Sequence, residues 1–390
     1  MKTSLCAAAA WFVLLALVPG YRGGAQVEWQ FSGYVLDLPV YQRVNPWFAS
    51  FLRTEQDQAL NITRVRLRPT LLLWDGARVT LEHEVVAWYH STALPDYQTA
   101  AITRRQAVNL TWNTVEESRL TLRQFVDRLY FRQNFDFGSL VVGRQRISWG
   151  TGRIWNPTDL FNPINPASFD KIEKDGADAV SFKYYLGSFT DVEVVYNAEE
   201  KFKSWNAGFR FRTNFSEYDV SVVGGYFDKR YVAGGDFAGN LFEAGVRGEG
   251  IVSANKDDLG DSYVKCILGI DYQFTSKLYA LAEYQYNGEG EKDKNRYRFL
   301  FDRLAQGAIL NFARNYLFVQ GLYQLHPLVM TGLGVNLNLD DGSGFIAPSV
   351  TWSSTENSEL GLGGLLTYGA GETEYWYYPL AVYVKGQWYF

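Results

Sequence analysis

Residues 62–89 read ITRVRLRPTLLLWDGARVTLEHEVVAWY, and this stretch decides the fold. On either side of the Asp75-Gly76 step, charged and apolar residues alternate. The charged members before and after the step are Arg64, Arg66, Arg68, Arg78, Glu82 and Glu84. A period of two is typical of a β-strand with one apolar face and one polar face. The stretch therefore predicts two antiparallel strands joined by a tight turn.

The same alternation recurs along the chain, and the composition agrees with it. Aromatic residues make up 16% of the sequence and glycines number 36, which favours strands over disorder. Segment 104–113 fits either a further strand or a loop, and segments 38–61, 90–118, 149–176 and 289–313 are expected to be long polar loops. The predicted strands are 27–37, 62–73, 77–89, 119–134, 139–148, 177–186, 189–198, 204–214, 217–227, 230–238, 241–252, 262–274, 277–288, 314–325, 328–339, 344–353, 358–368 and 379–390.

The N-terminus predicts export. Lys2 precedes an apolar run over 6–18, and small residues follow at 23–25, so residues 1–25 are expected to be a cleaved signal peptide. Thirteen apolar residues are too few for a membrane-spanning helix, which needs about 20. No later uninterrupted apolar run exceeds five residues, so the mature chain, 26–390, excludes helical membrane proteins. Cys266 alone cannot form an internal disulfide.

The last predicted strand carries a second signal. Apolar residues alternate along it, and the chain finishes on Trp388, Tyr389 and Phe390. This ending resembles the C-terminal assembly signal of Gram-negative outer-membrane β-barrels, with Trp388 and Phe390 as its signal residues. The resemblance implies an all-β, transmembrane antiparallel up-and-down barrel of about 18 strands (16 to 20), placed among outer-membrane lipids by the barrel-assembly machinery. A secreted β-sandwich, which alternates too, is the alternative.

A barrel in lipid also predicts the register of the first hairpin. A three-residue loop, 74–76, would place Arg68 opposite Glu82 and Arg66 opposite Glu84. A two-residue turn would pair Arg68 with His83 and bring charge to the lipid face. A Lys or Arg there costs about 2–4 kcal/mol at mid-membrane depth, so we expect the first register.

Barrels of 16–18 strands leave an aqueous interior, which the polar faces of the strands would line. Two interpretations stay open for the charged residues there. They could form an eyelet that selects hydrated solutes, including anions, or they could form arginine–carboxylate ladders that stiffen the wall. The candidate pore-lining residues are Arg64, Arg66, Arg68, Glu82, Glu84, Arg128, Arg132, Arg144, Arg146, Arg210 and Arg212.

Segment 149–176 is unusual for a loop. Three Asn-Pro steps lie within it, and proline fixes φ and biases the preceding residue toward extended structure. Its tryptophans, Trp149 and Trp155, are too apolar for a loop in water, so we expect it to fold inward and constrict the lumen. The alternative is a loop that caps the rim or braces a neighbouring subunit. The candidate constriction charges are Arg153, Asp159, Asp170, Lys171, Glu173 and Lys174, facing Arg144 and Arg146.

The same region carries a second resemblance. The sequence Gly143-Arg144-Gln145, then Trp149-Gly150, then Asn156-Pro157-Thr158-Asp159 and Asn162-Pro163, resembles a motif of several porin-like outer-membrane families of Proteobacteria and related phyla. Some barrels with similar motifs resemble the sheath of porin–cytochrome conduits. This chain has no Cys-x-x-Cys-His, so any haem would come from a partner.

The predicted function is a porin: passive diffusion of small hydrophilic solutes, with anions included, and no enzyme activity, cofactor or metal. The alternative is a structural sheath around a partner such as a multihaem cytochrome. A third class is an outer-membrane lipid hydrolase, but the three histidines (His83, His90 and His326) are scattered. Porin-like barrels often trimerise, which makes a homotrimer an option, and a net charge of −5 speaks against nucleic acid.

Overall fold

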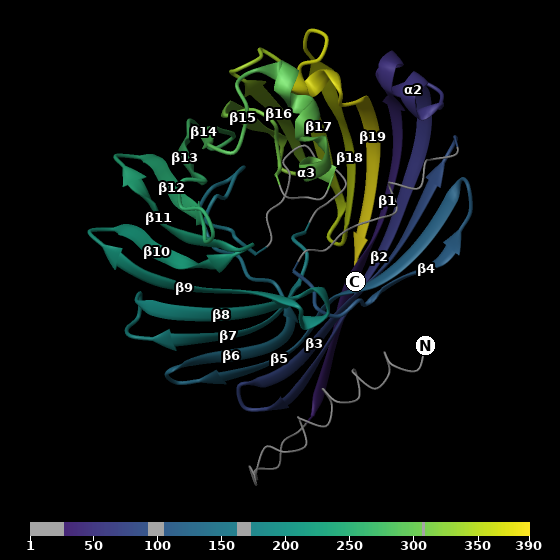
Figure 1. Ribbon diagram of the computed structural model, residues 1–390. Coiled ribbons are helices and arrows are strands. Elements are labelled where there is room, and N and C mark those ends of the chain that lie inside the picture. The colour runs from purple at the N-terminus through teal and green to yellow at the C-terminus, as the bar shows by residue number, and fades with distance from the viewer. Residues whose placement is uncertain (1–26, 93–104, 162–172, 306–308) are drawn as a thin grey trace.

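The computed structural model is a closed barrel of antiparallel strands surrounding an opening (Figure 1). The first strand, β1 (Glu28–Arg43), pairs with the last, β19 (Leu380–Tyr389), and Val35 stands opposite Trp388. The predicted all-β barrel is confirmed. The expected signal peptide, 1–25, lies outside the described residues, which are 27–92, 105–161, 173–305 and 309–390.

The other strands follow in chain order, and each pairs with its sequence neighbours, except that β3 pairs with β5 as well as β2. Eighteen strands complete the ring, as predicted, because β4 lies beside β5 where β6 has already ended. The remaining bounds are β2 (Asp57–Trp74), β3 (Ala77–His90), β4 (Thr111–Glu116), β5 (Leu120–Phe135), β6 (Gly138–Gln145), β7 (Ala177–Tyr185), β8 (Asp191–Glu199), β9 (Ser204–Phe215), β10 (Tyr218–Phe227), β11 (Arg230–Leu241), β12 (Ala244–Asn255), β13 (Ser262–Gln273), β14 (Leu278–Asn287), β15 (Asn315–His326), β16 (Val329–Asn338), β17 (Gly344–Thr355) and β18 (Ser358–Tyr368).

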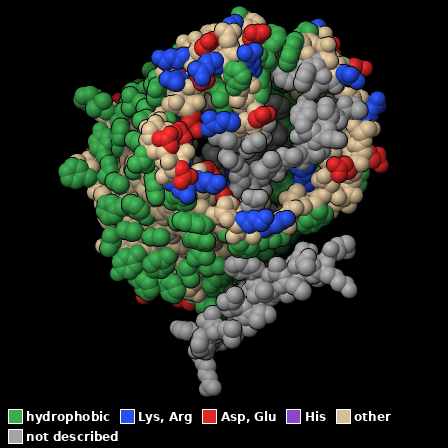
Figure 2. Space-filling view, in the orientation of Figure 1, with side chains coloured by type: hydrophobic (Ala, Val, Ile, Leu, Met, Phe, Trp, Pro, Cys, Tyr) green, Lys and Arg blue, Asp and Glu red, His purple; other side chains and the backbone are tan. Residues whose placement is uncertain are grey.

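Alternate residues of each strand face opposite sides of the wall. On β13, Leu268 is 61% exposed, whereas Ile267 is 4% exposed and stands opposite the buried Glu249 of β12. Apolar side chains cover much of the outer wall in Figure 2, and charged side chains gather around the mouth. The outer face is therefore apolar, and the polar side chains that alternate with the apolar ones lie on the inner face.

The first hairpin has the predicted register but not the predicted loop. Arg66 stands opposite Glu84, as expected. The turn between Trp74 and Ala77 holds two residues, and the ladder shifts between Leu72 and Trp74. A β-bulge adds one residue to one strand of a pair. The extra residue in β2 shifts the pairing by one position, so a two-residue turn gives the register that was predicted with a three-residue loop.

A bulge in β5 changes which side chains face inward. Glu82 stands opposite Arg128 and His83 opposite Val126, so Asp127 has no partner of its own across the ladder. Asp127 and Arg128 are adjacent in sequence, yet both side chains reach inward-facing partners. Asp127 forms an ion pair with Arg66, and Arg128 forms one with Glu82. Strict alternation would have placed one of them on the outer face.

The wall between β5 and β8 is completed by residues 105–116. β6 and β7 are short, and beyond their ends this segment takes their place. Its β4 pairs with β5, and the Leu110 carbonyl accepts a hydrogen bond from the Val126 N–H at 3.0 Å. On the other side, the Ala107 carbonyl accepts from the Lys201 N–H at 3.0 Å. Of the ambiguous segment 104–113, the strand thus begins only at Thr111, and residues 105–110 form irregular wall.

The helices of the described chain lie in the connections. They are α2 (Pro46–Leu52), η3 (Glu200–Phe202), η4 (Lys294–Phe299), α3 (Phe301–Ala305) and η5 (Glu374–Trp376). None of them is long and apolar enough to cross a membrane. The expectation of polar loops at 38–61 and 289–313 was wrong. β1 and β2 occupy the two ends of the former, with α2 between them, and the latter contains buried aromatic residues such as Tyr297 and Phe312.

Candidate functional site

The chain that follows β6 lies against the inner face of the barrel, where Glu249 holds it. The Glu249 carboxylate accepts hydrogen bonds from the backbone N–H groups of Thr151, Gly152 (2.5 Å) and Thr158 (3.1 Å), and from the Thr158 hydroxyl at 2.8 Å. Glu249 is 4% exposed. One wall carboxylate therefore fixes two points of this segment, which we call the inner segment (residues 149–161).

A second carboxylate, Glu283 of β14, anchors the next turn of the inner segment. It accepts hydrogen bonds from the backbone N–H groups of Arg153 at 2.8 Å, Ile154 at 3.1 Å and Trp155 at 2.7 Å. Hydrogen bonds to an ionised acceptor are roughly twice as strong as neutral ones. Backbone N–H groups, rather than side chains, make these contacts, so no residue type in the segment could indicate them.

Aromatic packing holds further parts of the inner segment against the inner face of the wall. Trp149 packs edge-on against Phe161 at 5.1 Å between ring centroids, and its Nε1 donates to Glu193 of β8 at 3.1 Å. Trp155 packs against Phe318 of β15 at 6.4 Å. Because β8 and β15 are seven steps apart in a ring of eighteen, and β12 and β14 between them hold the anchoring carboxylates, the inner segment lines a broad arc of the wall.

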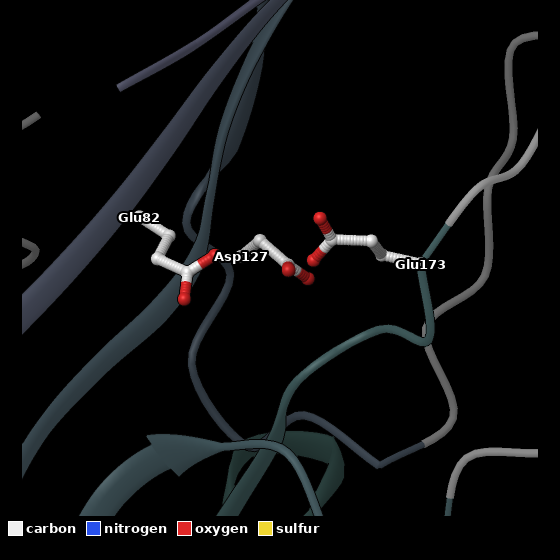
Figure 3. A group of neighbouring side chains, drawn as sticks. All are labelled: Glu82, Asp127 and Glu173. Atoms are coloured by element: carbon white, nitrogen blue, oxygen red, sulfur yellow. The ribbon is translucent and has the colours of Figure 1, made fainter. Parts of the chain in front are cut away.

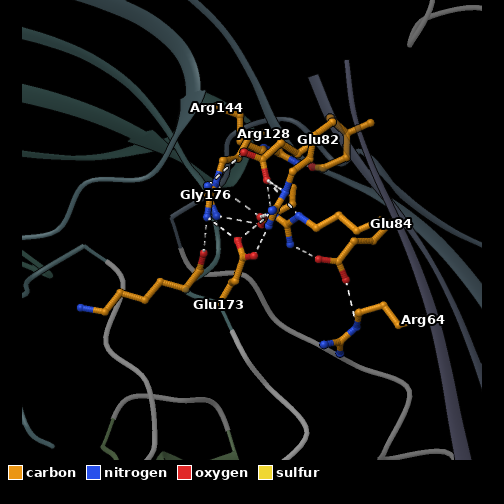
Figure 4. A network of polar contacts seen from close by, with 12 residues as sticks. Arg64, Glu82, Glu84, Arg128, Arg144, Glu173 and Gly176 are labelled. Carbon is orange, nitrogen blue, oxygen red and sulfur yellow. Dashed lines mark hydrogen bonds and ion pairs between the residues drawn. The ribbon is translucent and has the colours of Figure 1, made fainter. Parts of the chain in front are cut away.

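An ionic cluster lines the inner face of β2, β3 and β5 (Figure 4). Arg66, 1% exposed, lies at its centre and contacts the carboxylates of Glu82 (2.5 Å), Glu84, Asp127 and Glu173 (3.3 Å). Further pairs join Arg64 to Glu84 at 3.1 Å, Arg128 to Glu82 at 3.0 Å, and Arg68 to Glu173. The members of the ionic cluster are Arg64, Arg66, Arg68, Glu82, Glu84, Asp127, Arg128 and Glu173.

The charges of the ionic cluster balance, with four arginines and four carboxylates. Glu173, which was expected to face Arg144 and Arg146, instead contacts the arginines of β2 and β5 and so ties the long 146–176 connection to the wall. A buried charge is tolerated only when it is paired. This balance favours the ladder interpretation for these residues over an eyelet with a net field.

Three carboxylates of the ionic cluster could also suggest a cation site. One oxygen each of Glu82, Asp127 and Glu173 lies within 4.8 Å of the others (Figure 3). All three also contact Arg66. A divalent ion would have to displace guanidinium groups that already neutralise these oxygens, so the geometry favours arginine pairing.

Three more inward arginines each face a carboxylate on a neighbouring strand. The pairs are Arg210 with Glu193 at 3.1 Å, Arg212 with Asp191 at 2.8 Å, and Arg247 with Asp271. The Arg212 side chain is 47% exposed, so this pair is in contact with solvent. Arg132, also predicted to line the pore, stands opposite Arg78 of β3.

Arg144 does not line the lumen as predicted. It shares the face of Val142, which stands opposite the 41% exposed Val180 on the outer side of the wall. Its guanidinium is covered by residues 105–110, and it donates to Asp178 at 2.7 Å and to the carbonyls of Val126 (2.9 Å) and Val108. Arg144 therefore satisfies backbone groups at the junction where residues 105–110 join the wall.

The remaining candidate charges of the long connection are dispersed. Arg146 and Arg153 are exposed. Asp159, 3% exposed, forms an ion pair with Lys174. Asp170 and Lys171 lie outside the described residues.

A second inner structure, which the sequence analysis missed, is an aromatic cluster built from two connections. Residues 288–305, 309–313 and 369–379 bring aromatic rings against inward-facing residues of β15 and β17. Glu374, 1% exposed, lies among them and accepts hydrogen bonds from the Phe312 N–H (3.0 Å), Asn338 Nδ2 (2.9 Å) and the Tyr316 hydroxyl. The aromatic cluster comprises Tyr297, Phe301, Phe312, Tyr316, Phe318, Phe345 and Tyr375.

Burial of Glu374 raises the pKa of its carboxyl group to about 7. The three hydrogen-bond donors favour the ionised form, but desolvation outweighs them, and the nearby Asp341 adds repulsion. The run Tyr375 to Tyr378, four aromatic residues in a predicted loop, was the sequence signal that could have revealed this cluster.

The two predicted assembly residues lie where the barrel closes. The Phe390 N–H and carbonyl exchange hydrogen bonds with Gly33 of β1 at 3.1 and 2.9 Å. The Phe390 ring stacks on Phe31 at 5.7 Å and packs against Trp388 at 5.2 Å. These contacts continue the β1–β19 ladder to the end of the last strand.

No family model matches the chain, and no curated protein matches it in sequence. The fold is similar to that of OccAB1 from Acinetobacter baumannii (9% identity, 92% of this chain and 96% of that chain, TM-score 0.58). It is also similar to OccD3 (OpdP) from Pseudomonas aeruginosa (8% identity, 96% of each chain, TM-score 0.54) and OccAB3 from Acinetobacter baumannii (8%, 92% and 99%, TM-score 0.53). The chain thus has the fold of Gram-negative outer-membrane porins.

Proposed function

We propose that this protein is an outer-membrane channel through which small hydrophilic solutes diffuse passively. The observation that carries the proposal is the inner segment, which lies inside a closed barrel and is anchored to its inner face by Glu249 and Glu283. A narrowing fixed by buried carboxylates gives a sieve of constant width. The polar inner face offers hydrogen-bonding groups to a hydrated solute, and the apolar outer face suits lipid.

The alternative, a sheath around a multihaem cytochrome, requires an empty lumen. The inner segment packs against both β8 and β15, and the aromatic cluster occupies the side of β15 and β17. A folded partner would have to displace both. These contacts support a solute channel over a sheath.

A hydrolase is not proposed. His83, the histidine considered for it, lies on the outer face, where its ring stacks on Trp112 at 5.8 Å between centroids. Among the described residues, no serine or carboxylate is hydrogen-bonded to it.

We also propose self-association through the outer face of β1 and β2. Asp37 faces outward there, away from the buried Leu36 and Leu38, and accepts hydrogen bonds from Asn61 (2.9 Å) and Thr63 (2.7 Å). A carboxylate on a lipid-facing wall is costly, and a second copy of the chain would cover it. Sedimentation in detergent should show an oligomer. Thr63→Trp should dissociate this oligomer, whereas Val222→Trp, on the exposed face of β10, should leave it intact. A monomeric unaltered protein would contradict this arrangement.

The channel itself is tested by single-channel recording of the refolded chain in a planar bilayer. Steady conductance steps in the sub-nanosiemens to nanosiemens range are expected for a narrowed, water-filled barrel of this size (about 16–18 strands). A protein that is inserted and protease-resistant but gives no steps would exclude the diffusion channel.

A further inference from the structure

Two inward-facing arginines at the short-turn end of the barrel differ from the others. Arg78 of β3 and Arg132 of β5 stand directly opposite each other in the ladder. Both share the inner face with Thr80, which is 7% exposed and precedes Glu82 of the ionic cluster on that face. Cβ atoms of directly opposed residues lie about 5 Å apart, so the two arginine side chains leave the wall from neighbouring positions on the inner face.

The ladder neighbours of this pair carry no compensating charge. Arg78 stands opposite Leu72 on its other side, and Arg132 stands opposite Val141. Within the described chain, neither arginine forms an ion pair or a hydrogen bond, and the Nε of each is buried without a partner. Like charges directly opposed across a ladder are destabilising.

Other inward-facing arginines differ from this pair because they have carboxylate partners. Arg66, Arg210 and Arg212 each contact at least one carboxylate of the wall. Those pairs leave no net charge for a passing solute. Arg78 and Arg132 therefore place two positive charges side by side on the inner face with no carboxylate opposite either of them in the ladder.

We propose that Arg78 and Arg132 form a binding site for an oxyanion group, a carboxylate or phosphate, of a solute in the lumen. A guanidinium presents two parallel N–H donors that match such a group, and two guanidiniums side by side can hold it between them. The anion would also relieve their mutual repulsion. This inference rests on the proposed channel and names the class of solute that it favours.

The test is recording of the full-length mature channel under a KCl gradient, followed by addition of succinate, inorganic phosphate or the neutral succinamide. The unaltered channel should prefer chloride, and succinate or phosphate should block the current saturably whereas succinamide should not. Arg78→Gln/Arg132→Gln should shift the reversal potential toward zero and weaken the block by about fivefold or more, the effect of losing one close charge contact in water.

Two variants serve as controls. Arg43→Gln/Arg119→Gln removes two exposed cations outside the lumen and should leave the reversal potential and the block unchanged. Arg78→Lys/Arg132→Lys keeps the charge but loses the paired donors, so the chloride preference should persist while the block weakens. The lysine variant also covers the case in which the glutamine variant does not fold.

The outcomes separate the two proposals. A channel without steps would contradict the proposed function itself. A conducting channel that shows no anion preference, or that succinate and succinamide block equally, would leave the channel intact and overturn the oxyanion site. A block that both double variants retain would also overturn it.

Discussion

The ionic cluster and the aromatic cluster occupy the same lumen but are held together by different physics. The ionic cluster joins four arginines to four carboxylates across β2, β3 and β5, and every member depends on the others. The aromatic cluster is held by apolar packing and encloses one carboxyl group, that of Glu374. Both narrow the lumen, and the ionic cluster does so without net charge. Selection by charge must therefore come from groups outside the ionic cluster.

The strongest test of the comparison is Arg66→Met, which removes the centre of the ionic cluster. Four carboxylates would lose a partner, and breaking a buried ion network in this way costs about 3–5 kcal/mol. The midpoint of guanidinium-induced unfolding from lipid vesicles should fall accordingly. Arg212→Gln, which breaks a solvent-exposed pair, is the control and should cost less than about 1 kcal/mol. Equal effects would mean that burial does not distinguish the two sites.

The second test loosens the inner segment without substituting a residue of either cluster. Glu283→Ala leaves three buried N–H groups of the segment unpaired, and each hydrogen bond to a charged group contributes about 1.5–3 kcal/mol. We expect larger and noisier conductance steps in a planar bilayer. Glu283→Gln keeps an acceptor oxygen and should restore most of the quiet conductance. Unchanged steps in the alanine variant would show that the segment does not limit the current.

The smallest expected effect is a pH dependence of the folding stability, which comes from Glu374 in the aromatic cluster. Because burial raises the pKa of Glu374 to about 7, its contribution to folding is fully present below the ordinary carboxyl pKa of 4.5 and is lost as pH rises toward 7. One pKa unit corresponds to about 1.4 kcal/mol, and relaxation around Glu374 should reduce the total loss to about 1–2 kcal/mol. Unfolding midpoints between pH 4.5 and 8 should slope less in Glu374→Gln. Parallel slopes for the two proteins would remove Glu374 as the cause.

The sequence predicted the barrel because lipid outside and water inside impose a strict period of two. The strand number and the pairing of Arg66 with Glu84 followed from that period. The prediction failed where a bulge breaks the period, since Asp127 and Arg128 both face inward. It also failed at Arg144, whose partners in residues 105–110 come from a segment that could not be assigned by pattern.

The inner structures were only partly accessible from sequence. Prolines and tryptophans indicated that segment 149–176 is stiff and apolar, but its anchors, Glu249 and Glu283, bind backbone N–H groups that every residue has. Segment 289–313 was expected to be a long polar loop. Its position inside the barrel is decided by Tyr297 and Phe312, which are buried and stack on each other with 5.4 Å between ring centroids.

The order of the strands has a consequence for how the chain folds. The wall is built mainly from pairs of strands that are adjacent or nearly adjacent in sequence, which are local contacts of low contact order and form quickly. The β1–β19 ladder alone joins the two ends of the chain. Its loop-closure entropy cannot be offset until the intervening hairpins are in place. We therefore expect hydrogen-exchange protection of β1 and β19 to appear last during refolding into lipid, after that of hairpins such as β11–β12.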